Sequence, residues 1–463
     1  MDQISIRRAS IANLGCKVNQ AEMDVVERLL RTRGVEMVGE HASADLVLIN
    51  TCSVTSMADQ KSRQAVRRAR RINPAARILV TGCSVEIDPD ALATADPSAS
   101  LIDNESKAAG RLAAELTCLL DGRAAGGPES AASSPAASGP DFDRTRAFIK
   151  IQDGCSLHCT YCIIPRARGP ERSVPAGMVL AEVRDAVATG HREVVLTGIN
   201  VGAYDCGDGS PLAALVGRVL AETGVERIRL SSIEPQHVTD ELLDAWCDSA
   251  GRCLPHFHIP LQSGDDTILR RMGRRYDTAY FADVVARVRR AFPEAALDAD
   301  VIAGFPGEEE AAWARTLGFV RDLDLAGVHV FRYSPRPGTA AVRMVGQVDS
   351  QTMKRRAAEG LALAAEARAG FAATLLGRDL RVLFERPRAD GLWHGHADNY
   401  VPVEVAPGAA TGAATAQGAG QQNVIGLVRA ESVSPADPGV IVGRLLAVDP
   451  PSRRIGTHEA LAE

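Results

Sequence analysis

Three cysteines in the middle of the chain have the spacing of iron ligands. Cys155, Cys159 and Cys162 lie within eight residues of one another, in the segment DGCSLHCTYC. Three thiolates on one short loop can hold three corners of a cubane iron–sulfur cluster, and without a fourth nearby cysteine the last iron stays open to another ligand. A structural zinc site is the alternative, but zinc takes four ligands, and His158 lies in a poor position between two of the cysteines.

A second set of three cysteines is spread over the N-terminal part of the chain. Cys16, Cys52 and Cys83 end the strand-like runs NLGC, LINTC and LVTGC. If these strands are parallel neighbours, the three thiols emerge at the carboxyl edge of one sheet, where open α/β sheets bind ligands. We therefore predict a second three-thiolate cluster site, with buried structural thiols as the alternative. The other four cysteines follow no ligand spacing and are interpreted as ordinary thiols: Cys118, Cys206, Cys247 and Cys253.

The elements around these cysteines predict an α/β fold in two parts. In residues 1–120, strand-like runs alternate with helical patterns, which indicates a parallel sheet. In residues 144–374 the same alternation continues, and six strands in this arrangement indicate a partial barrel, with a doubly wound sheet as the alternative. These six runs begin at Ala147, Glu193, Arg227, His256, Ala296 and Gly327.

Two segments rich in Gly, Ala, Ser and Pro interrupt these patterns. Residues 121–143 can bury little apolar surface, so they are predicted to be a flexible linker. Residues 406–422 have the same character but lie among short strand-like runs, and they are predicted to be a loop within a small domain. These runs, over residues 375–449, indicate a small β-barrel of the OB-like kind.

Composition limits the classes of protein that fit this sequence. The chain has 463 residues, of which 46% are hydrophobic and 24% charged, with a net charge of −6. We find no apolar run of the length that spans a membrane and no signal peptide, so we expect a cytoplasmic protein with no membrane partner. The net charge does not favour nucleic acid, but one predicted helix is strongly basic and offers either a phosphate-binding patch or a solvated face. Its cations are Lys61, Arg63, Arg67, Arg68, Arg70, Arg71 and Arg77.

The central cysteine motif resembles the signature of the radical S-adenosylmethionine (SAM) enzymes, with aromatic Tyr161 before the last cysteine. The surrounding text, KIQDGCSLHCTYCIIPRARG, is similar to the methylthiotransferase branch, as are LTGINVGAY, RLSSIEP, HIPLQSGDDTILRRMGR and DVIAGFPGE. This resemblance implies SAM and two [4Fe–4S] clusters, each with three cysteine ligands. It also implies that one SAM methylates sulfur at or near the Cys16/Cys52/Cys83 cluster. A second SAM is cleaved at the other cluster, and its radical removes a hydrogen that acid–base chemistry could not remove.

Polar residues at the ends of the barrel strands are candidates for binding SAM. In barrels of this kind the active site lies at the carboxyl ends of the strands. Gly198 lacks a Cβ, which would allow the cofactor to approach the backbone. The candidates are Tyr161, Thr197, Gly198, Ser231, Glu234, Gln262 and Asp300. His256 and His258 share one face of the fourth strand.

The N-terminal motifs favour one substrate. NLGCKVNQAEMD, NTCSVTSMADQKSRQ and VTGCSVE are similar to the type that acts on N6-threonylcarbamoyladenosine in tRNA, whereas prenyladenosine enzymes tend to have GCQMN and ribosomal-protein enzymes GCPKN. We therefore predict methylthiolation of C2 of N6-threonylcarbamoyladenosine at tRNA position 37. The alternatives are an enzyme acting on N6-prenyladenosine 37 and a non-catalytic zinc-containing RNA-binding protein. The expected partners are the tRNA anticodon stem-loop, a sulfur donor and an electron donor such as flavodoxin or ferredoxin.

The C-terminal segment resembles a TRAM domain, a barrel that binds RNA. Such modules combine basic residues with aromatic side chains on which bases stack. The candidates are Arg378, Arg381, Arg386, Arg388, Phe384, Trp393 and Tyr400, of which Phe384 is expected in the core instead. With tRNA as the substrate, the basic N-terminal helix is predicted to contact the tRNA backbone.

Overall fold

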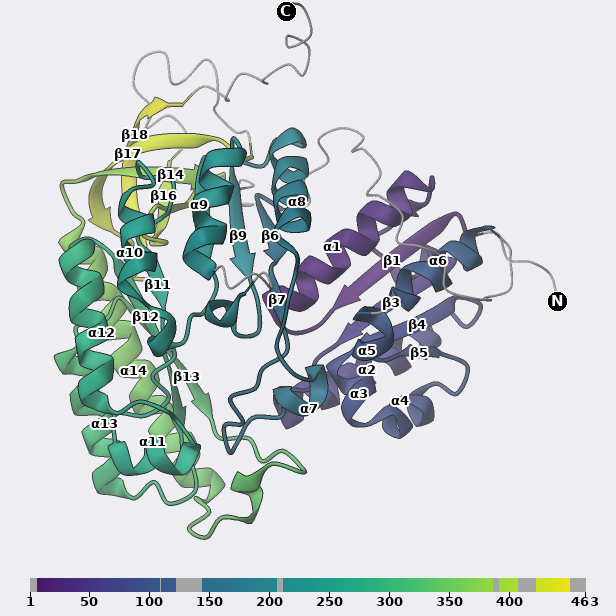
Figure 1. Cartoon of the computed structure of the whole chain (residues 1–463), viewed down its shortest axis with the longest axis horizontal. Helices are drawn as coiled ribbons and strands as arrows, with labels where there is room; N and C mark the ends of the chain where they lie inside the picture. Colours follow the sequence, from purple (N-terminus) through teal and green to yellow (C-terminus); the bar gives the residue numbers. More distant parts are fainter. Residues whose placement is uncertain are drawn as a thin grey trace, which may run out of the picture.

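Three units built on β-sheets make up the protein in the computed structural model (Figure 1). The predicted linker and the predicted loop of the small domain lie almost wholly outside the described residues. The structure describes residues 6–108, 110–121, 144–205, 211–385, 391–406 and 422–449. Within these ranges no helix is both long and apolar enough to cross a membrane.

The N-terminal unit is a five-stranded parallel sheet in the order β2-β1-β3-β4-β5. Its strands are β1 (Arg8–Asn13), β2 (Glu36–Met37), β3 (Leu46–Thr51), β4 (Arg77–Gly82) and β5 (Ser100–Ile102). Its helices are α1 (Lys17–Thr32), α2 (Ser56–Ile72), α3 (Cys83–Ile87), α4 (Pro89–Ala95), α5 (Asn104–Ala108) and α6 (Arg111–Asp121), with a short 3-10 turn at His41–Ser43.

Helices cover both faces of this sheet, which explains why its central strand is continuously apolar. Side chains of β3 alternate between the faces: Leu46 and Leu48 pack with α1, and Val47 and Ile49 pack with α2. All six residues of β3 are buried. The central strands therefore hold the residues that follow them in fixed positions at one edge.

The middle unit is an open barrel of six parallel strands whose spatial order follows the sequence. Hydrogen bonds join β6-β9-β10 and β11-β12-β13, and Ile228 links the two groups through Arg252 and Leu254. This order confirms the predicted partial barrel and rules out the doubly wound sheet. The strands are β6 (Arg146–Lys150), β9 (Glu193–Thr197), β10 (Arg227–Leu230), β11 (His256–His258), β12 (Ala296–Ala303) and β13 (Gly327–Arg332).

Helices surround the outside of this barrel and form its largest apolar core with the outward faces of the strands (Figure 1). The helices are α7 (Ile164–Arg168), α8 (Ala176–Ala188), α9 (Leu212–Glu222), α10 (Asp240–Cys247), α11 (Asp266–Met272), α12 (Thr278–Ala291), α13 (Glu310–Asp322) and α14 (Ser350–Thr374). A small antiparallel pair, β7 (Gln152–Asp153) and β8 (Arg172–Ser173), brackets the cysteine loop, and 3-10 turns lie at Val201–Ala203, Pro235–His237 and Ala340–Arg343.

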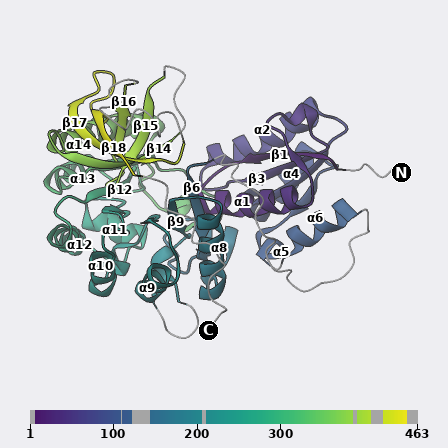
Figure 2. The ribbon, with the colours of Figure 1, turned by 90° about the horizontal axis from the view of Figure 1, so that it is seen from above.

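The C-terminal unit is a closed barrel in the order β14-β15-β16-β18-β17, as predicted. Its strands are β14 (Asp379–Phe384), β15 (Trp393–Ala397), β16 (Pro402–Val405), β17 (Ile425–Val433) and β18 (Ile441–Val448). Between β15 and β16 the chain reverses at Tyr400, which has a φ of +68°. Figure 2 shows this barrel over one side of the six-stranded barrel, with the N-terminal unit beside it.

Candidate cluster and cofactor sites

The loop that carries Cys155, Cys159 and Cys162 lies beyond the carboxyl end of β6 and is fixed by backbone contacts. Gly154 has a φ of +71°, and a Cβ there would lie 2.0 Å from the carbonyl oxygen of Pro170. The amide of Cys155 donates to the carbonyl oxygen of Gly169 at 3.1 Å, and the amide of Cys162 donates to the carbonyl oxygen of Cys159 at 2.9 Å. The loop is thus held in one conformation.

The three thiols face one another closely enough to influence one another's ionisation. Burial raises the pKa of Cys155 to about 11 and that of Cys162 to about 12, and the neighbouring cysteines add to both increases. Three such thiols would not ionise together without a cation, and metal ligation requires the thiolate. His158 is exposed and has a φ of +51°, which turns the chain between Cys155 and Cys159. These donors fit an iron–sulfur cluster.

Arg274 is the cation nearest to this loop. Its Nη1 donates to Cys159 Sγ at 3.3 Å, its Nη2 pairs with Glu234, and its Nε donates to the Tyr276 hydroxyl at 3.0 Å. Glu234, Arg274 and Tyr276 line a small pocket together with Cys159. The sequence analysis named Glu234 but missed Arg274, although Arg274 is the last residue of the motif HIPLQSGDDTILRRMGR.

Two of the predicted SAM-binding residues carry buried hydroxyls that lack a hydrogen-bond partner among the described residues. They are Thr197 at the end of β9 and Ser231 just after β10. The strands are neighbours, since the amide of Ser231 donates to the carbonyl of Leu196 at 3.0 Å. A buried polar group without a partner is costly, so these hydroxyls fit a polar ligand at this edge of the barrel. A Cβ on Gly198 would lie 2.9 Å from Gln152 Oε1, so packing against this side chain is a further reason for a glycine here. The approach of SAM to this backbone stays a prediction.

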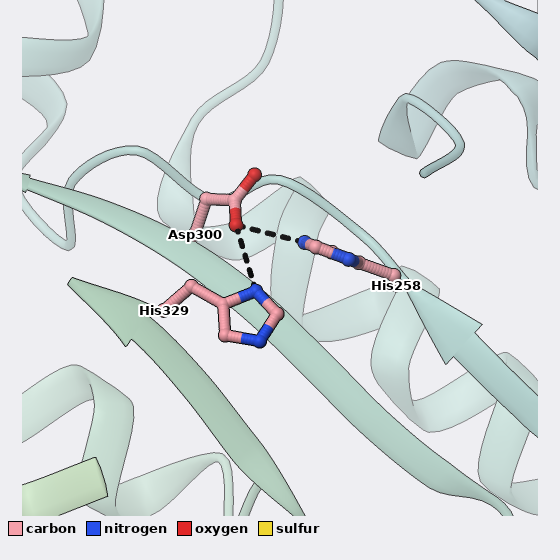
Figure 3. A group of neighbouring side chains, drawn as sticks. All are labelled: His258, Asp300 and His329. Carbon is pink, nitrogen blue, oxygen red and sulfur yellow. Dashed lines mark hydrogen bonds and ion pairs between the residues drawn. The ribbon is translucent and has the colours of Figure 1, made fainter. Parts of the chain in front are cut away.

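Of the remaining three candidates, Tyr161 lies in the cysteine loop, Gln262 follows β11 and Asp300 lies on β12. Tyr161 packs edge-on against Phe305, with ring centroids 6.2 Å apart. Gln262 has a φ of +69° and donates its amide to the carbonyl of Asp300 at 2.7 Å. The Asp300 carboxylate accepts from His258 at 2.8 Å and lies 3.3 Å from His329 Nδ1, so it is engaged by two imidazoles (Figure 3).

Cys16, Cys52 and Cys83 follow three adjacent parallel strands, β1, β3 and β4, as predicted. Cys52 and Cys83 are buried and Cys16 is exposed. A Cβ on Gly15 would lie 3.1 Å from Cys52 Sγ, so the loop after β1 passes directly over that thiol. Burial raises the pKa of Cys52 to about 11, and Cys83 and Cys16 raise it further. This set has the same donor chemistry as the first.

Arg168 connects the two cysteine sets. It lies on α7, shortly after Cys162, and influences the pKa of Cys83, which burial raises and Arg168 lowers. Its Nη1 also donates to Glu22 of α1 at 3.1 Å and to Asp153 at 2.9 Å. One buried guanidinium therefore joins the chain that leaves the first cysteine loop to the sheet that carries the second set.

Comparisons with known proteins agree with both sites. The profile described as Uncharacterized protein family UPF0004 matches residues 8–103, and that of the Radical SAM superfamily matches residues 149–320. The threonylcarbamoyladenosine tRNA methylthiotransferase MtaB of Bacillus subtilis is 37% identical over 84% of this chain and 88% of its own length. The chain belongs to the radical SAM tRNA methylthiotransferase family.

Other relatives of this family carry two different names. The MtaB protein of Chlamydia pneumoniae is 40% identical over 74% of this chain and 78% of its own length. The tRNA-2-methylthio-N(6)-dimethylallyladenosine synthase of a Parafrankia species is 36% identical over 76% and 73%. The solved structure of the radical SAM methyltransferase TsrM from Kitasatospora setae has a TM-score of 0.51 and 15% identity, over 70% of this chain and 73% of that one, and shows a shared fold.

As a member of this methylthiotransferase family, the enzyme uses SAM and [4Fe–4S] clusters as its cofactors. It is a transferase of sulfur-containing groups. The alternative of a non-catalytic zinc protein is therefore wrong. Cys118, Cys247 and Cys253 are free thiols. Cys206 lies outside the described residues.

The structure changes the expected RNA-stacking surface of the C-terminal barrel. Phe384 and Trp393 pack against each other in the core, with ring centroids 5.5 Å apart. Tyr400 packs on His256 and His396, and Arg229 lies 4.6 Å from its ring centroid. Phe384 and Trp393 are buried in the core of the C-terminal barrel, and Tyr400 packs against the six-stranded barrel. None of the three rings therefore has a face free to stack on a base.

The predicted basic residues of this barrel are also partly engaged. Arg378 pairs with Glu294, and Arg381 lies 3.4 Å from Asp449. Arg386 and Arg388 lie outside the described residues. The basic helix α2 differs, because Lys61, Arg67, Arg68 and Arg71 are exposed along it.

Proposed function

We propose that this enzyme adds a methylthio group to C2 of N6-threonylcarbamoyladenosine at position 37 of tRNA. The observation that carries the proposal is the buried connection through Arg168, which holds two sets of three cysteines at one interface. A single nucleotide bound there would meet both sets. The motif GCKVNQ and the MtaB relatives favour the threonylcarbamoyl substituent.

The cysteines are proposed to divide between the two clusters. Cys155, Cys159 and Cys162 would ligate the cluster that binds SAM, and Cys16, Cys52 and Cys83 the auxiliary cluster. When bound, these groups supply the methyl group, the sulfur and the radical that removes the C2 hydrogen.

The chain's own side chains would position the cofactor and the first cluster. Arg274 places a positive charge beside Cys159, where it can attract the carboxylate of an amino-acid ligand. Thr197 and Ser231 would gain hydrogen bonds to the cofactor, and Glu234 holds Arg274 in place. Tyr161, Gly198, Gln262 and Asp300 are also proposed to contribute to binding the cofactor.

The proposed division of the chain follows the sheets. Residues 1–120 form the methylthiotransferase domain and residues 144–374 the radical SAM core, with residues 121–143 as the linker and residues 375–449 as the TRAM domain. We place the enzyme in the cytoplasm with the anticodon stem-loop of tRNA as its macromolecular substrate. A sulfur donor and an electron donor such as flavodoxin or ferredoxin complete the reaction.

Nucleoside mass spectrometry of a deletion strain tests the substrate. We expect loss of 2-methylthio-N6-threonylcarbamoyladenosine, restored by the wild-type gene. Loss of the methylthio-prenyl nucleoside alone would show that the enzyme acts on prenyladenosine.

Iron analysis of anaerobically purified protein tests the ligands. We expect about eight irons per chain in the wild type and about four in Cys52→Ala or Cys155→Ala. The exposed Cys247→Ala is the matched control and should keep the full iron content. Full iron in either ligand variant would contradict the assignment.

A further inference from the structure

Three side chains on neighbouring barrel strands bring two imidazoles to one carboxylate. His258 lies on β11, Asp300 on β12 and His329 on β13, and one ligand atom of each lies within 4.8 Å of the other two. His258 Nε2 lies 2.8 Å and His329 Nδ1 3.3 Å from Asp300 Oδ1 (Figure 3). The bond lengths of zinc separate neighbouring ligand atoms on one ion by about 3 Å. Both distances to Asp300 therefore suit a shared metal ion.

The register of the strands places these three residues on one face. Asp300 lies opposite His329 in the pairing of β12 with β13, and His258 lies opposite Asp298 in the pairing of β11 with β12. Successive residues of a strand point to opposite faces of a sheet, so the positions beside these three should face the helices. Those positions belong to the helix-facing apolar core: Phe257, Ile259, Ala299, Val301, Val328 and Val330. The two imidazoles and the carboxylate therefore face the barrel interior from paired strands.

The charges around this group favour a cation. Although burial acts to raise it, hydrogen bonds from the two imidazoles hold the pKa of Asp300 well below its usual range, so this carboxylate is ionised. Asp298 adds a second carboxylate on the same strand, 3.0 Å from His256 Nε2. The hydrogen bond with Asp300 and the charge of Asp298 raise the pKa of His329, whereas burial and Lys17 lower it. Two carboxylates thus act on this imidazole against one lysine.

A second group of histidines and a carboxylate lies in the C-terminal barrel, but it suits a metal ion less well. The ligand atoms of Glu385, His394 and His396 also lie within 4.8 Å of one another. Arg146 Nη1, however, donates to Glu385 Oε1 at 2.7 Å. A guanidinium cannot give up its proton, so it would remain as a positive charge beside the ion. At Asp300 Oδ1 the contacts are two imidazoles, which become metal ligands when they lose a proton.

We propose that His258, Asp300 and His329 bind a divalent transition-metal ion of the zinc class. Two imidazoles and one carboxylate are a ligand set that zinc takes when a fourth position stays open to water or to an oxygen of a bound molecule. Asp300 binds through Oδ1, because both imidazoles lie at this oxygen while Oδ2 points away from them (Figure 3). The side chain of His329 is 53% exposed, which gives the ion a path into the site. This site shares no ligand with the two cysteine sets.

Zinc analysis of the reconstituted holoenzyme tests this site. Both iron–sulfur clusters are assembled first, so that their cysteines carry iron, and the protein is then equilibrated with ZnCl2 and separated from free ion. We expect about one zinc per chain in the wild type, with an unchanged iron content. His258→Gln and His329→Gln should each weaken zinc binding about 100-fold or more in a competition titration with a chelator. Loss of a ligand should cost at least as much as loss of an outer-shell partner, which costs about 10-fold to 100-fold.

A matched variant and a spectrum of the wild type separate this site from other binding of zinc. His394→Gln removes a histidine of the second group and should keep the wild-type affinity for zinc. X-ray absorption at the zinc edge needs no variant, and it should show nitrogen and oxygen ligands without sulfur. A wild type that retains no zinc, zinc bound by sulfur, or zinc retained by His329→Gln and lost from His394→Gln would each overturn the site. The proposed function would stand in all three cases.

Discussion

Arg168 Nη1 lies 3.1 Å from Glu22 Oε1, and these side chains are 1% and 6% exposed. Glu22 belongs to α1, which begins next to Cys16, and Arg168 ends α7, which begins shortly after Cys162. Lys107 and Lys150 contact the same carboxylate at 2.6 and 3.1 Å. Glu22 thus contacts three cations where the N-terminal sheet meets the six-stranded barrel, and Asp153 contacts two of the same three.

We expect Glu22→Gln to weaken this interface strongly. Lys107 would lose the carboxylate that it contacts, and Arg168 and Lys150 would keep only Asp153. Breaking a buried ion pair from one side costs about 3 kcal/mol or more in the free energy of unfolding. Thermal denaturation and limited proteolysis of the holoenzyme would measure the loss. Glu27→Gln, which breaks the more exposed pair with Arg31 on the same helix, is the control and should cost below about 1 kcal/mol. Equal losses in the two variants would contradict the prediction.

Replacing Arg67 and Arg71 of α2 with Gln should weaken tRNA binding and reduce its salt dependence. Both side chains are exposed, and each phosphate contact contributes about 0.7 to 0.9 to the slope of log K against log salt. Binding titrations with tRNA at several salt concentrations would measure the slope. Arg290→Gln, exposed on α12, is the matched control. An unchanged slope in the α2 variant would mean that this helix is only a solvated surface.

Tyr400→Ala should destabilise the protein through the contact between its two barrels. The ring packs on His256 at 4.8 Å and lies beneath Arg229, so its removal leaves a gap and strips an arginine of its aromatic partner. We expect a loss of about 2 kcal/mol, visible as a lower melting temperature. Weaker tRNA binding at an unchanged melting temperature would instead identify Tyr400 as a base-stacking residue.

Glu308→Gln should change how stability depends on pH. Burial raises the pKa of Glu308 to about 7, although the amide of Gly304 and the guanidinium of Arg356 oppose the shift. The folded state therefore holds a proton that the unfolded state releases above pH 4.5, and this residue makes stability fall as pH rises from about 4.5 to about 7. The Gln variant lacks this dependence.

Melting temperatures from pH 5 to pH 8 would test this prediction. As pH rises, the free energy of unfolding of the variant should increase relative to that of the wild type, by up to about 3 kcal/mol. A constant difference across this range would show that Arg356 keeps Glu308 ionised throughout.

Much of the fold follows from local sequence patterns. The strands that precede Cys16, Cys52 and Cys83 contain short apolar runs because helices cover both faces of their sheet, and the alternation of these runs with helical patterns predicted a parallel sheet with its cysteines at one edge. The six barrel strands were recognisable because strand-like runs alternate with helical stretches along this part of the chain. The edge strands β2 and β5 were missed, because two or three residues carry too little periodicity.

The site was only partly predictable. Cys155, Cys159 and Cys162 act within one loop, so their spacing alone predicts a cluster. Arg274 and Arg168 depend on contacts with residues far away in sequence, and nothing in their own segments indicates which cysteine each approaches. Tyr400 was interpreted as a base-stacking residue, because a single sequence does not show which ring meets another domain.

By itself, the sequence determined the two cysteine sets, the α/β architecture and the resemblance to the methylthiotransferases, since spacing and periodicity are local properties of the chain. Tertiary structure alone decided that Arg168 contacts Glu22 of the N-terminal unit and that His258 and His329 both lie against Asp300. The reason is physical: electrostatic fields and hydrogen bonds act through space, and only folding brings residues that are distant in sequence into contact.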